Sequence, residues 1–274
     1  MLAIEERKLM SKITQAFANN KAFIPFITCG DPDLTTTHKL VKAAVDNGAD
    51  IIQLGIPFSD PTAEGLAIQA ANLRALKKKI TTDDVFNLVQ TMRQDISAPF
   101  ILTTYANAVF SYGIESFFER CAQVGAEGVL IADVPYEEKD EFEGLALKHG
   151  VELISLVSPT SEHRIAKIAK EARGFVYIIS SLGNTKSRDE LLSDIKHMVK
   201  LVREHTDLPC AVGIGISTPE QAKDVAAISD GAVVGSAILN IIAQYGKEAA
   251  PHVGSLVKSM KDAVNAGACA GAGA

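Results

Sequence analysis

The stretch PCAVGIGISTPEQAKDVAAISDGAVVGS, residues 209–236, carries the pattern that decides the fold. It begins with a short apolar run from Pro209 and ends with another from Gly231. Neither run alternates with charged residues, which is typical of buried parallel strands. Between them, Thr218 stands at the cap of a predicted helix and Pro219 at its first position. The stretch therefore predicts two parallel strands joined by a helix.

Six similar runs precede this unit: AFIPFIT from Ala22, DIIQLG from Asp50, PFILTTY from Pro99, GVLIAD from Gly128, VELISLV from Val151 and FVYIIS from Phe175. The segments between the runs resemble helices; for example, residues 81–94 begin with capping and acidic residues and continue with apolar residues at helical spacing. Eight strands, each followed by a helix, predict an α/β fold of the (β/α)8 TIM-barrel type. We also expect an extra helix at about 64–76 and a short helix near 11–19 that closes the barrel bottom.

An open doubly wound sheet is the alternative architecture, and it should carry a glycine-rich turn after its first strand. Here AFIPFIT is followed by CGDPD, with a single glycine, which favours the barrel. No linker rich in proline and serine divides the chain. We therefore expect one barrel domain over residues 11–265, an extension at 1–10 and a flexible tail at 266–274.

Composition excludes several classes of function. The 274 residues carry a net charge of −6, so no overall field attracts nucleic acid or an anionic membrane. The chain has neither a long uncharged apolar stretch nor the apolar core of a signal peptide, which predicts no membrane span and no signal peptide. The four cysteines lie far apart and form no CxxC pair, which predicts reduced thiols in a cytoplasmic protein. The six histidines form no HExxH motif, so we expect no metal site.

Active sites of such barrels lie at the carboxyl ends of the strands. The last two strands end in glycine turns, at Gly215 and at Gly235 with Ser236. Such turns let backbone N–H groups approach a phosphate, although glycines there could also serve tight turns alone. Their presence on two adjacent strands favours a phosphate site. The loop after FVYIIS is long and polar, which predicts a lid over this site.

The loop after the second strand carries a distinctive signature. Residues 46–76, DNGADIIQLGIPFSDPTAEGLAIQAANLRAL, closely resemble a conserved segment of the tryptophan synthase α chain family. Other segments resemble the same family, in the same order: FIPFITCGDPD, YANAVFSYGIESFFERCAQVG, VLIADVP, GFVYIISSLGNT, GIGIST and VVGSAI. The resemblance covers about residues 11–265, and it implies the barrel fold that the spacing predicts.

The resemblance also implies an activity and a partner. The family cleaves indole-3-glycerol phosphate, a phosphorylated small molecule, to indole and glyceraldehyde 3-phosphate in tryptophan biosynthesis. It implies a β-chain partner in an α2β2 heterotetramer, with pyridoxal phosphate in the β chain and no cofactor in this chain. Four residues match the family's β-contacting loops: Pro57, Asp60, Asn107 and Pro135.

The family's catalytic glutamate on the second strand is replaced here by Gln53. An amide has no proton to transfer, and general acid–base catalysis contributes about 10²–10⁴-fold, so the resemblance implies impaired catalysis. Glu64 matches the family's second carboxylate, which is an aspartate, and Tyr177 matches a tyrosine near the ring and the acid.

Other matching positions concern substrate binding. The indole-sized slot is expected to include Phe26, Tyr105, Leu130, Ala132 and Val157. Thr103 stands on a face of the slot that is usually apolar, and Thr185 belongs to the lid. The phosphate clamp is expected to include Gly215, Gly235 and Ser236, together with two departures from the family pattern: Lys186 for a glycine and Ile214 for a frequent phenylalanine.

Three hypotheses about function stay open at this point. The chain is a working α chain that delivers indole to a β chain, a binding and regulatory subunit with little lyase activity, or an enzyme for another phosphorylated substrate. In the third case Glu64 or Tyr177 would be the acid–base group. The PFSDP loop favours the first two hypotheses over the third, and Gln53 favours the second over the first.

Overall fold

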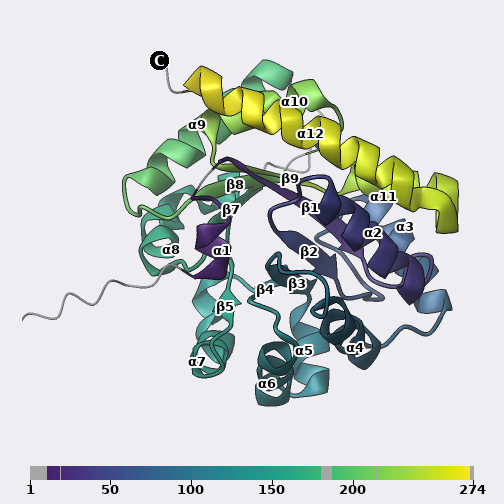
Figure 1. Ribbon diagram of the computed structural model, residues 1–274. Helices are drawn as coiled ribbons and strands as arrows, with labels where there is room; N and C mark the ends of the chain where they lie inside the picture. Colours follow the sequence, from purple (N-terminus) through teal and green to yellow (C-terminus); the bar gives the residue numbers. More distant parts are fainter. Residues whose placement is uncertain (1–10, 19, 180–186, 214, 272–274) are drawn as a thin grey trace, which may run out of the picture.

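The computed structural model describes residues 11–18, 20–179, 187–213 and 215–271, and its parallel strands wrap into a barrel (Figure 1). The order around the sheet is β5-β4-β3-β2-β1-β9-β8-β7-β6. The strands are β1 (Ala22–Thr28), β2 (Ile52–Gly55), β3 (Phe100–Thr104), β4 (Gly128–Ile131), β5 (Glu152–Leu153), β6 (Ser155–Val157), β7 (Val176–Ile179), β8 (Cys210–Gly213) and β9 (Gly231–Val234).

The barrel closes within a single stretch of chain. The two edge strands, β5 and β6, are separated by Ile154 alone, whose N–H donates to the Val129 carbonyl over 2.8 Å. β5 pairs with β4 and β6 pairs with β7, so the predicted strand VELISLV is divided between two neighbours. The predicted barrel of eight strand-like runs is confirmed, and the open sheet is excluded.

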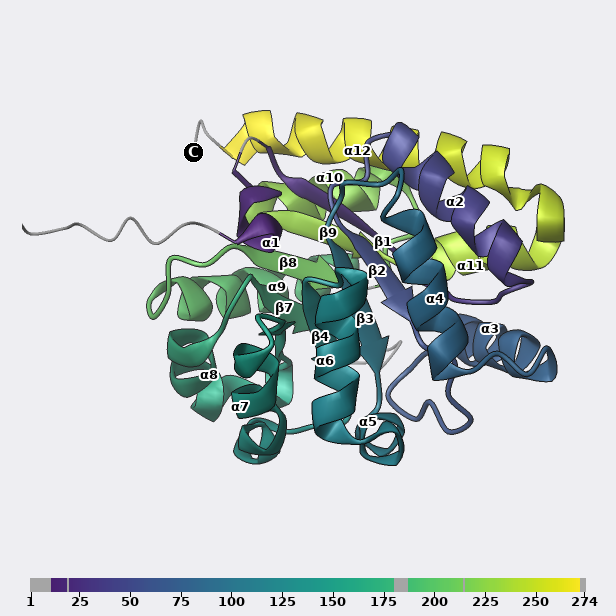
Figure 2. The ribbon, with the colours of Figure 1, turned by 60° about the horizontal axis from the view of Figure 1, so that its bottom comes forward.

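Helices surround the barrel (Figures 1 and 2). They are α1 (Lys12–Gln15), α2 (Leu34–Asp46), α3 (Leu66–Lys77), α4 (Thr82–Met92), α5 (Ala106–Tyr112), α6 (Ile114–Val124), α7 (Asp140–Lys148), α8 (Ile165–Glu171), α9 (Arg188–Arg203), α10 (Pro219–Ile228), α11 (Ser236–Tyr245) and α12 (Ala249–Gly271), with 3-10 turns η1 (Tyr136–Glu138), η2 (Pro159–Arg164) and η3 (Gly246–Glu248). The expected extra helix in the second interval is α3. None of the helices described is long and apolar enough to cross a bilayer.

Local sequence signals set the helix starts. Thr218 accepts a hydrogen bond from the Gln221 N–H, and Pro219 occupies the first position of α10, as predicted. Thr81 and Asp84 form the reciprocal capping pair of α4. The cap at Thr218 fixes where α10 begins after β8, and therefore the length of that loop at the carboxyl end of the barrel, whereas the cap at Thr81 fixes the start of α4 after α3.

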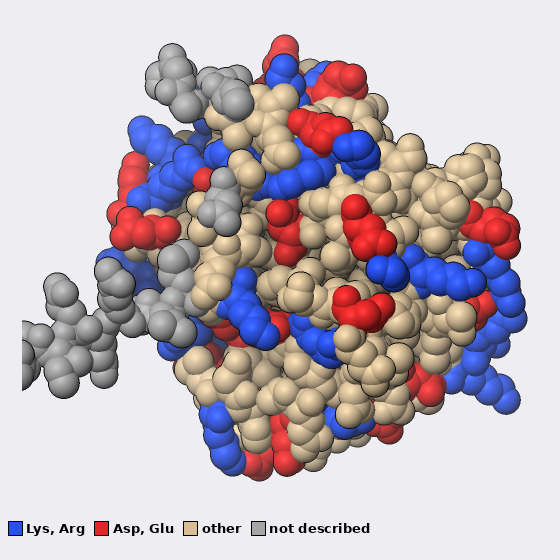
Figure 3. Space-filling view, in the orientation of Figure 1, with Lys and Arg blue, Asp and Glu red and all other residues tan. Residues whose placement is uncertain are grey.

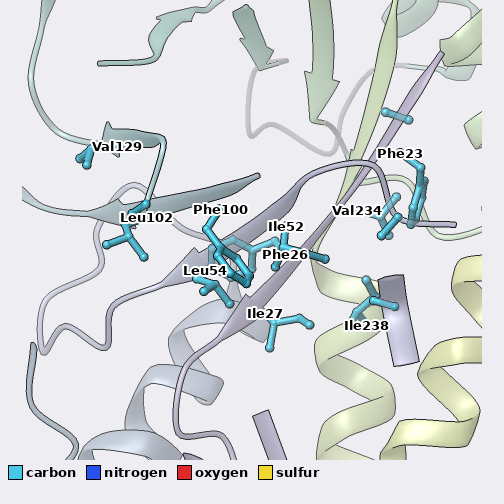
Figure 4. Packing of buried hydrophobic residues seen from close by; sticks show 14 of the residues in the cluster. Phe23, Phe26, Ile27, Ile52, Leu54, Phe100, Leu102, Val129, Val234 and Ile238 are labelled. Atoms are coloured by element: carbon cyan, nitrogen blue, oxygen red, sulfur yellow. The ribbon is translucent and has the colours of Figure 1, made fainter. Parts of the chain in front are cut away.

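The barrel has an inner and an outer apolar core. The outer core fills the space between strands and helices, and Figure 4 shows part of it around β1–β4, β9 and Ile238 of α11. The inner core lies inside the sheet and includes Ile24, Ile51, Ile101 and Leu130. Alternate residues along a strand point to opposite faces, so strands buried on both faces read as continuous apolar runs.

The amino-terminal end of the barrel is closed by α1. Ile13 is fully buried in the inner core, and the Phe17 ring lies 5.5 Å from the Phe175 ring, centroid to centroid. Gly174 keeps this closure compact, because a Cβ there would lie 2.7 Å from Glu152 Oε2. The expected closing helix is confirmed but is only four residues long. With this end filled, the opposite mouth remains for a site.

The tail begins later than expected. α12 continues through residues 266–271, and the two views place it along α10, α2 and α11 (Figures 1 and 2). The expected boundary at 266 is therefore wrong for these six residues. Gly267 explains the difference, because a Cβ there would lie 2.5 Å from the Lys223 carbonyl of α10. Only glycine permits this close approach of the two helices. The expected extension at 1–10 and residues 272–274 lie outside the described residues.

Candidate active site

A neutral polar pair lies inside the carboxyl-terminal mouth, on two adjacent strands. Gln53 of β2 and Thr103 of β3 are each 5% exposed. Gln53 Nε2 donates a hydrogen bond of 2.7 Å to Thr103 Oγ1. Gln53 Oε1 is buried and has no hydrogen-bond partner among the described residues. The position where the family has its acid therefore presents an amide whose oxygen is unpaired within the described part of the chain.

Glu64 lies in the loop that follows β2 and brings a carboxyl group to the same mouth. Its N–H donates to the Pro61 carbonyl over 3.1 Å, and Gln69 Nε2 donates to the Glu64 carbonyl over 2.8 Å. Burial raises the pKa of Glu64 to about 7. Burial also raises the pKa of Tyr105 and Tyr177, and the Glu64 charge raises both further. The Glu64 carboxyl group thus lies near both phenols and has a pKa close to neutral pH.

Apolar and aromatic side chains surround these polar groups. Phe26 is paired in register with Gln53, and its ring fills the space over Gly55, where a Cβ would lie 2.7 Å from Phe26 Cζ. The Tyr105 ring stacks on Phe58 with 4.8 Å between centroids. The inner core contributes the remaining apolar neighbours: Leu130, Ala132, Leu156 and the ring of Tyr177. Together these residues could enclose a flat bicyclic ring.

Val157 does not belong to this slot. It is fully buried in the outer core and is paired with Ile178, which faces the same layer. Its neighbour Leu156 is paired with Tyr177 and faces the barrel interior. Because successive residues of a strand point to opposite faces, only one of the two can line the slot. The expected placement of Val157 is therefore wrong, and Leu156 takes that place.

The two glycine turns lie at the same mouth. No described atom lies within 4 Å of the position that a Cβ would occupy at Gly215. At Gly235 a Cβ would lie 3.5 Å from Phe26, which links this turn to the slot. α11 begins at Ser236 without a side-chain cap, so no described side chain caps the N–H groups of its first turn. An anion fits this arrangement. Three expected binding residues lie outside the described residues, together with the lid loop 180–186: Thr185, Lys186 and Ile214.

Gly213 makes a contact at the mouth that the sequence analysis missed. A Cβ there would lie 2.3 Å from Tyr177 Oη, so only glycine admits the phenol at this place. The residue stands one position before the predicted glycine turn, and its role depends on a side chain from the neighbouring strand β7. The period of the strand could have identified Leu156, but no local signal identifies the contact of Gly213.

The described residues hold no cluster of three or more histidine, cysteine, aspartate or glutamate side chains that could bind a metal ion. Cys29, Cys121 and Cys210 are buried free thiols. Burial raises the pKa of Cys29 and of Cys210 to about 12. These thiols therefore stay protonated and unreactive near neutral pH.

Comparison with known proteins identifies the family. The family model described as tryptophan synthase alpha chain matches residues 13–266. The chain belongs to the tryptophan synthase alpha chain family. The alpha chain of Lacticaseibacillus casei is 46% identical over 258 residues, which cover 94% of this chain and 97% of that relative.

Solved structures of tryptophan synthase alpha chains share the fold. The crystal structure of the alpha chain from Legionella pneumophila subsp. pneumophila is 35% identical and matches with a TM-score of 0.84, covering 93% of this chain and 97% of that chain. A chain of the tryptophan synthase complex from Pyrococcus furiosus is 31% identical and matches with a TM-score of 0.81. The match covers 89% of this chain and 98% of that chain. Members of this family are lyases of tryptophan biosynthesis.

The positions that resemble the family's partner contacts differ in exposure. Asp60, Asn107 and Pro135 are exposed, whereas Pro57 is buried. Large apolar side chains are exposed close to them along the chain: Phe110 is 48% exposed on α5, and Leu66 is 83% exposed at the start of α3. On the face of the molecule that Figure 3 shows, acidic and basic residues are interspersed, and neither sign dominates.

Proposed function

We propose that this chain cleaves indole-3-glycerol phosphate to indole and glyceraldehyde 3-phosphate, and that it does so slowly. The observation that carries the proposal is the pair formed by Gln53 and Thr103 at the mouth of a tryptophan synthase alpha barrel. The slot and the glycine turns fit the two ends of the substrate, but the amide of Gln53 has no proton to give. Membership of a biosynthetic family supports a cytoplasmic location.

The reaction makes three demands on the site. Indole C3 must gain a proton, the glycerol hydroxyl next to the ring must lose one, and the ring N–H needs a partner. When C3 is protonated, the electron pair of the breaking carbon–carbon bond returns to the ring, and the hydroxyl carbon becomes the aldehyde of glyceraldehyde 3-phosphate. Protons therefore balance if one group gives a proton to C3 and a base takes the hydroxyl proton.

Glu64 is the group that we assign to this proton exchange. A pKa of about 7 leaves its carboxyl group divided between acid and base near neutral pH. Tyr177 and Tyr105 keep their protons, because burial and the Glu64 charge raise their pKa values, and they serve as hydrogen-bond donors. A single carboxyl group in place of two explains the expected low rate. We assign the phosphate to the turns at Gly215, Gly235 and Ser236.

We also propose a β-chain partner in an α2β2 assembly, with pyridoxal phosphate held by that partner. Exposed Asp60, Asn107 and Pro135, with the apolar side chains of Phe110 and Leu66, support such a contact surface. The name of the Pyrococcus furiosus structure, a tryptophan synthase complex, supports assembly in the family.

The second candidate function is a regulatory subunit, which Gln53 specifically favours because a binding protein needs no acid at that position. A lyase assay separates the candidates, with indole-3-glycerol phosphate and the full chain, alone and with a β chain. Slow indole release that the β chain accelerates is the expected result. No release, together with faster use of indole and serine by the β chain, would show a regulatory subunit. Turnover of about 1 s⁻¹ or more would refute impaired catalysis.

A further inference from the structure

Glu64 is turned into the barrel mouth although its neighbours along the chain face solvent. Ala63 is exposed and Leu66 is 83% exposed, whereas Glu64 is partly buried. Gly65 follows Glu64 and begins α3 without a side-chain cap, and a Cβ at Gly65 would meet no described atom within 4 Å. Glycine permits many backbone conformations. The packing of this short segment therefore does not fix the direction of the Glu64 side chain.

A side chain in the first turn of α3 supplies the missing constraint. Gln69 Nε2 donates a hydrogen bond of 2.8 Å to the Glu64 carbonyl, and the Gln69 N–H donates over 3.0 Å to the Gly65 carbonyl. One residue thus holds two consecutive peptide units, on both sides of the flexible glycine. Holding the Glu64 carbonyl fixes the ψ angle of Glu64 and so limits the directions in which its side chain can point.

The other end of the loop that carries Glu64 is held by the same helix. The Phe58 N–H donates over 3.2 Å to Asn72 Oδ1, and Asn72 is 5% exposed. The Phe58 ring in turn stacks on Tyr105, one of the two phenols close to the Glu64 carboxyl group. Gln69 and Asn72 are three positions apart, so they lie on one face of α3. This face therefore holds both ends of the loop.

α3 is itself anchored to the carboxyl end of β1, independently of the loop. Arg74 donates hydrogen bonds of 2.8 and 2.7 Å to the two carboxylate oxygens of Asp31, which is fully buried. A bidentate pair of this kind fixes geometry as well as adding energy. Ala71 and Ala75 of the same helix are also fully buried. The helix is therefore a rigid support for the side chains that hold the loop.

Burial, which depends on this orientation, decides the proton affinity of Glu64. Burial is the cause of its raised pKa. Tyr105 and Tyr177 face the carboxyl group and keep their protons, because burial and the Glu64 charge raise their pKa values. Asp60 of the same loop is exposed and accepts a hydrogen bond of 2.5 Å from Ser59 Oγ. A change in the direction of the Glu64 side chain would therefore change its hydration and its pKa.

We propose that Gln69 is the positioning residue of Glu64, and that its hydrogen bond to the Glu64 carbonyl directs the carboxyl group into the barrel mouth. Asn72 supports this role by holding the start of the same loop. The inference rests on the proposed function, which assigns proton exchange to Glu64. It adds that this exchange depends on a side chain of α3 that acts through the backbone.

Carbon-13 NMR of the glutamate carboxyl groups tests the proposal in the full chain, with the Glu64 signal assigned by its loss in Glu64→Gln. Gln69→Met keeps the length of the side chain and removes the donor. The pKa of Glu64 should then fall by about one pH unit, because a carboxyl group that is held less firmly is hydrated more readily. Gln69→Asn, whose amide is too short to reach the carbonyl, should give the same fall.

Gln90→Met, at an exposed position of α4, is the matched control and should leave the pKa of Glu64 unchanged. Asn72→Leu should lower this pKa less than Gln69→Met does, because Asn72 holds the end of the loop that is further from Glu64. Thermal unfolding confirms that each variant is folded. In the lyase assay, Gln69→Met should lower kcat about ten-fold, leave KM within two-fold and move the pH profile of kcat to lower pH.

An unchanged or raised pKa of Glu64 in the two Gln69 variants, an equal fall in Gln90→Met, or a change in KM alone would each overturn the proposal. The two assays separate this role from the proposed function. Absence of cleavage by the unaltered chain, together with a lowered pKa in Gln69→Met, would reject the proposed function and support the positioning of Glu64 by Gln69. Cleavage together with an unchanged pKa in Gln69→Met would reject this positioning role alone.

Discussion

Carboxyl groups at the two ends of the barrel differ in whether they have hydrogen-bond and ion-pair partners. At the amino-terminal end, Glu127 accepts hydrogen bonds from Arg93, from the Phe100 N–H over 2.9 Å and from Lys12 Nζ over 3.0 Å. At the mouth, Glu64 forms no ion pair with any described residue, and burial raises its pKa to about 7. A compensated carboxylate stabilises the fold, whereas an uncompensated one is available to exchange a proton.

The same contrast holds for other groups at the two ends. Asp50 accepts hydrogen bonds of 2.7 Å from both Lys261 Nζ and the Phe23 N–H, and these bonds join α12 and β1 at the amino-terminal side. Gln53 is only three residues further along the chain, yet its Oε1 has no partner among the described residues. An unsatisfied buried acceptor at the mouth is a place where a ligand can supply the missing hydrogen bond.

Restoring the carboxyl group at the mouth should have the largest effect. Gln53→Glu should raise the rate of indole release from indole-3-glycerol phosphate by about 10²-fold or more, because it returns a general acid to β2. The rate is measured for the chain alone and with a β chain. Gln90→Glu, on the exposed face of α4, should leave it unchanged. An unchanged rate in Gln53→Glu with intact ligand binding would show that the substrate is different.

Removing a compensated carboxylate at the other end should affect stability instead. Glu127→Ala should lower the free energy of unfolding by about 2 kcal/mol, because Arg93 loses its ion pair and the Phe100 N–H loses its acceptor. Urea denaturation measures the loss, and indole binding should stay within two-fold, about the change of a remote substitution. A large fall in indole affinity would contradict the separation of the two ends.

The pKa of Glu64 predicts a pH dependence of stability. The folded pKa of about 7 lies above the ordinary value of 4.5, so the folded chain binds more protons between these limits. The stability contributed by Glu64 is therefore fully present below pH 4.5 and is lost as pH rises through 7.

Glu64→Gln should remove this dependence. The difference in unfolding free energy between the unaltered chain and the variant should change by about 1–2 kcal/mol from pH 5 to pH 8. Other carboxyl groups with raised pKa values, such as Asp50, cancel in this difference. Parallel pH profiles for the two proteins would refute the raised pKa of Glu64.

Two neighbouring residues on β6 allow the finest comparison. Val157→Ala should cost about 1 kcal/mol of stability and leave indole binding unchanged, because Val157 packs in the outer core. Leu156→Ala should weaken indole binding a few-fold with a smaller loss of stability, because Leu156 is partly exposed toward the slot. Denaturation and fluorescence titration of both variants test the assignment, and the opposite pattern would restore Val157 to the slot.

The fold was predictable because strands buried on both faces leave a long-range pattern in the sequence. Runs such as AFIPFIT and GAVVGS, together with caps such as Thr218, identify the barrel without any contact being known. The division of VELISLV at Ile154 was not predicted, because it depends on which neighbouring strand each half meets. The placement of Leu156 and Val157 on opposite faces follows from period two, but the choice of face requires the register with β7.

The candidate site was predictable in its residues but not in its electrostatics. Gln53 and Thr103 could each be identified from the sequence, but their hydrogen bond depends on the register between β2 and β3. The raised pKa of Glu64 depends on how deeply its loop folds over the mouth, which no local pattern encodes. Long-range contacts therefore decide what the expected residues can do.

The break at Ile154 divides one side of the barrel between two short strands, β5 and β6, and we call this side the seam. β5 and β6 are two and three residues long, and each pairs with a single neighbouring strand, so the ring of backbone hydrogen bonds is thinnest there. Segments with few ladder bonds open at lower free energy than continuous strands. Amide hydrogens at 152–157 should therefore exchange faster than those of β1. Leu156 stands on this seam, so the part of the cylinder with the fewest ladder hydrogen bonds is also a wall of the slot.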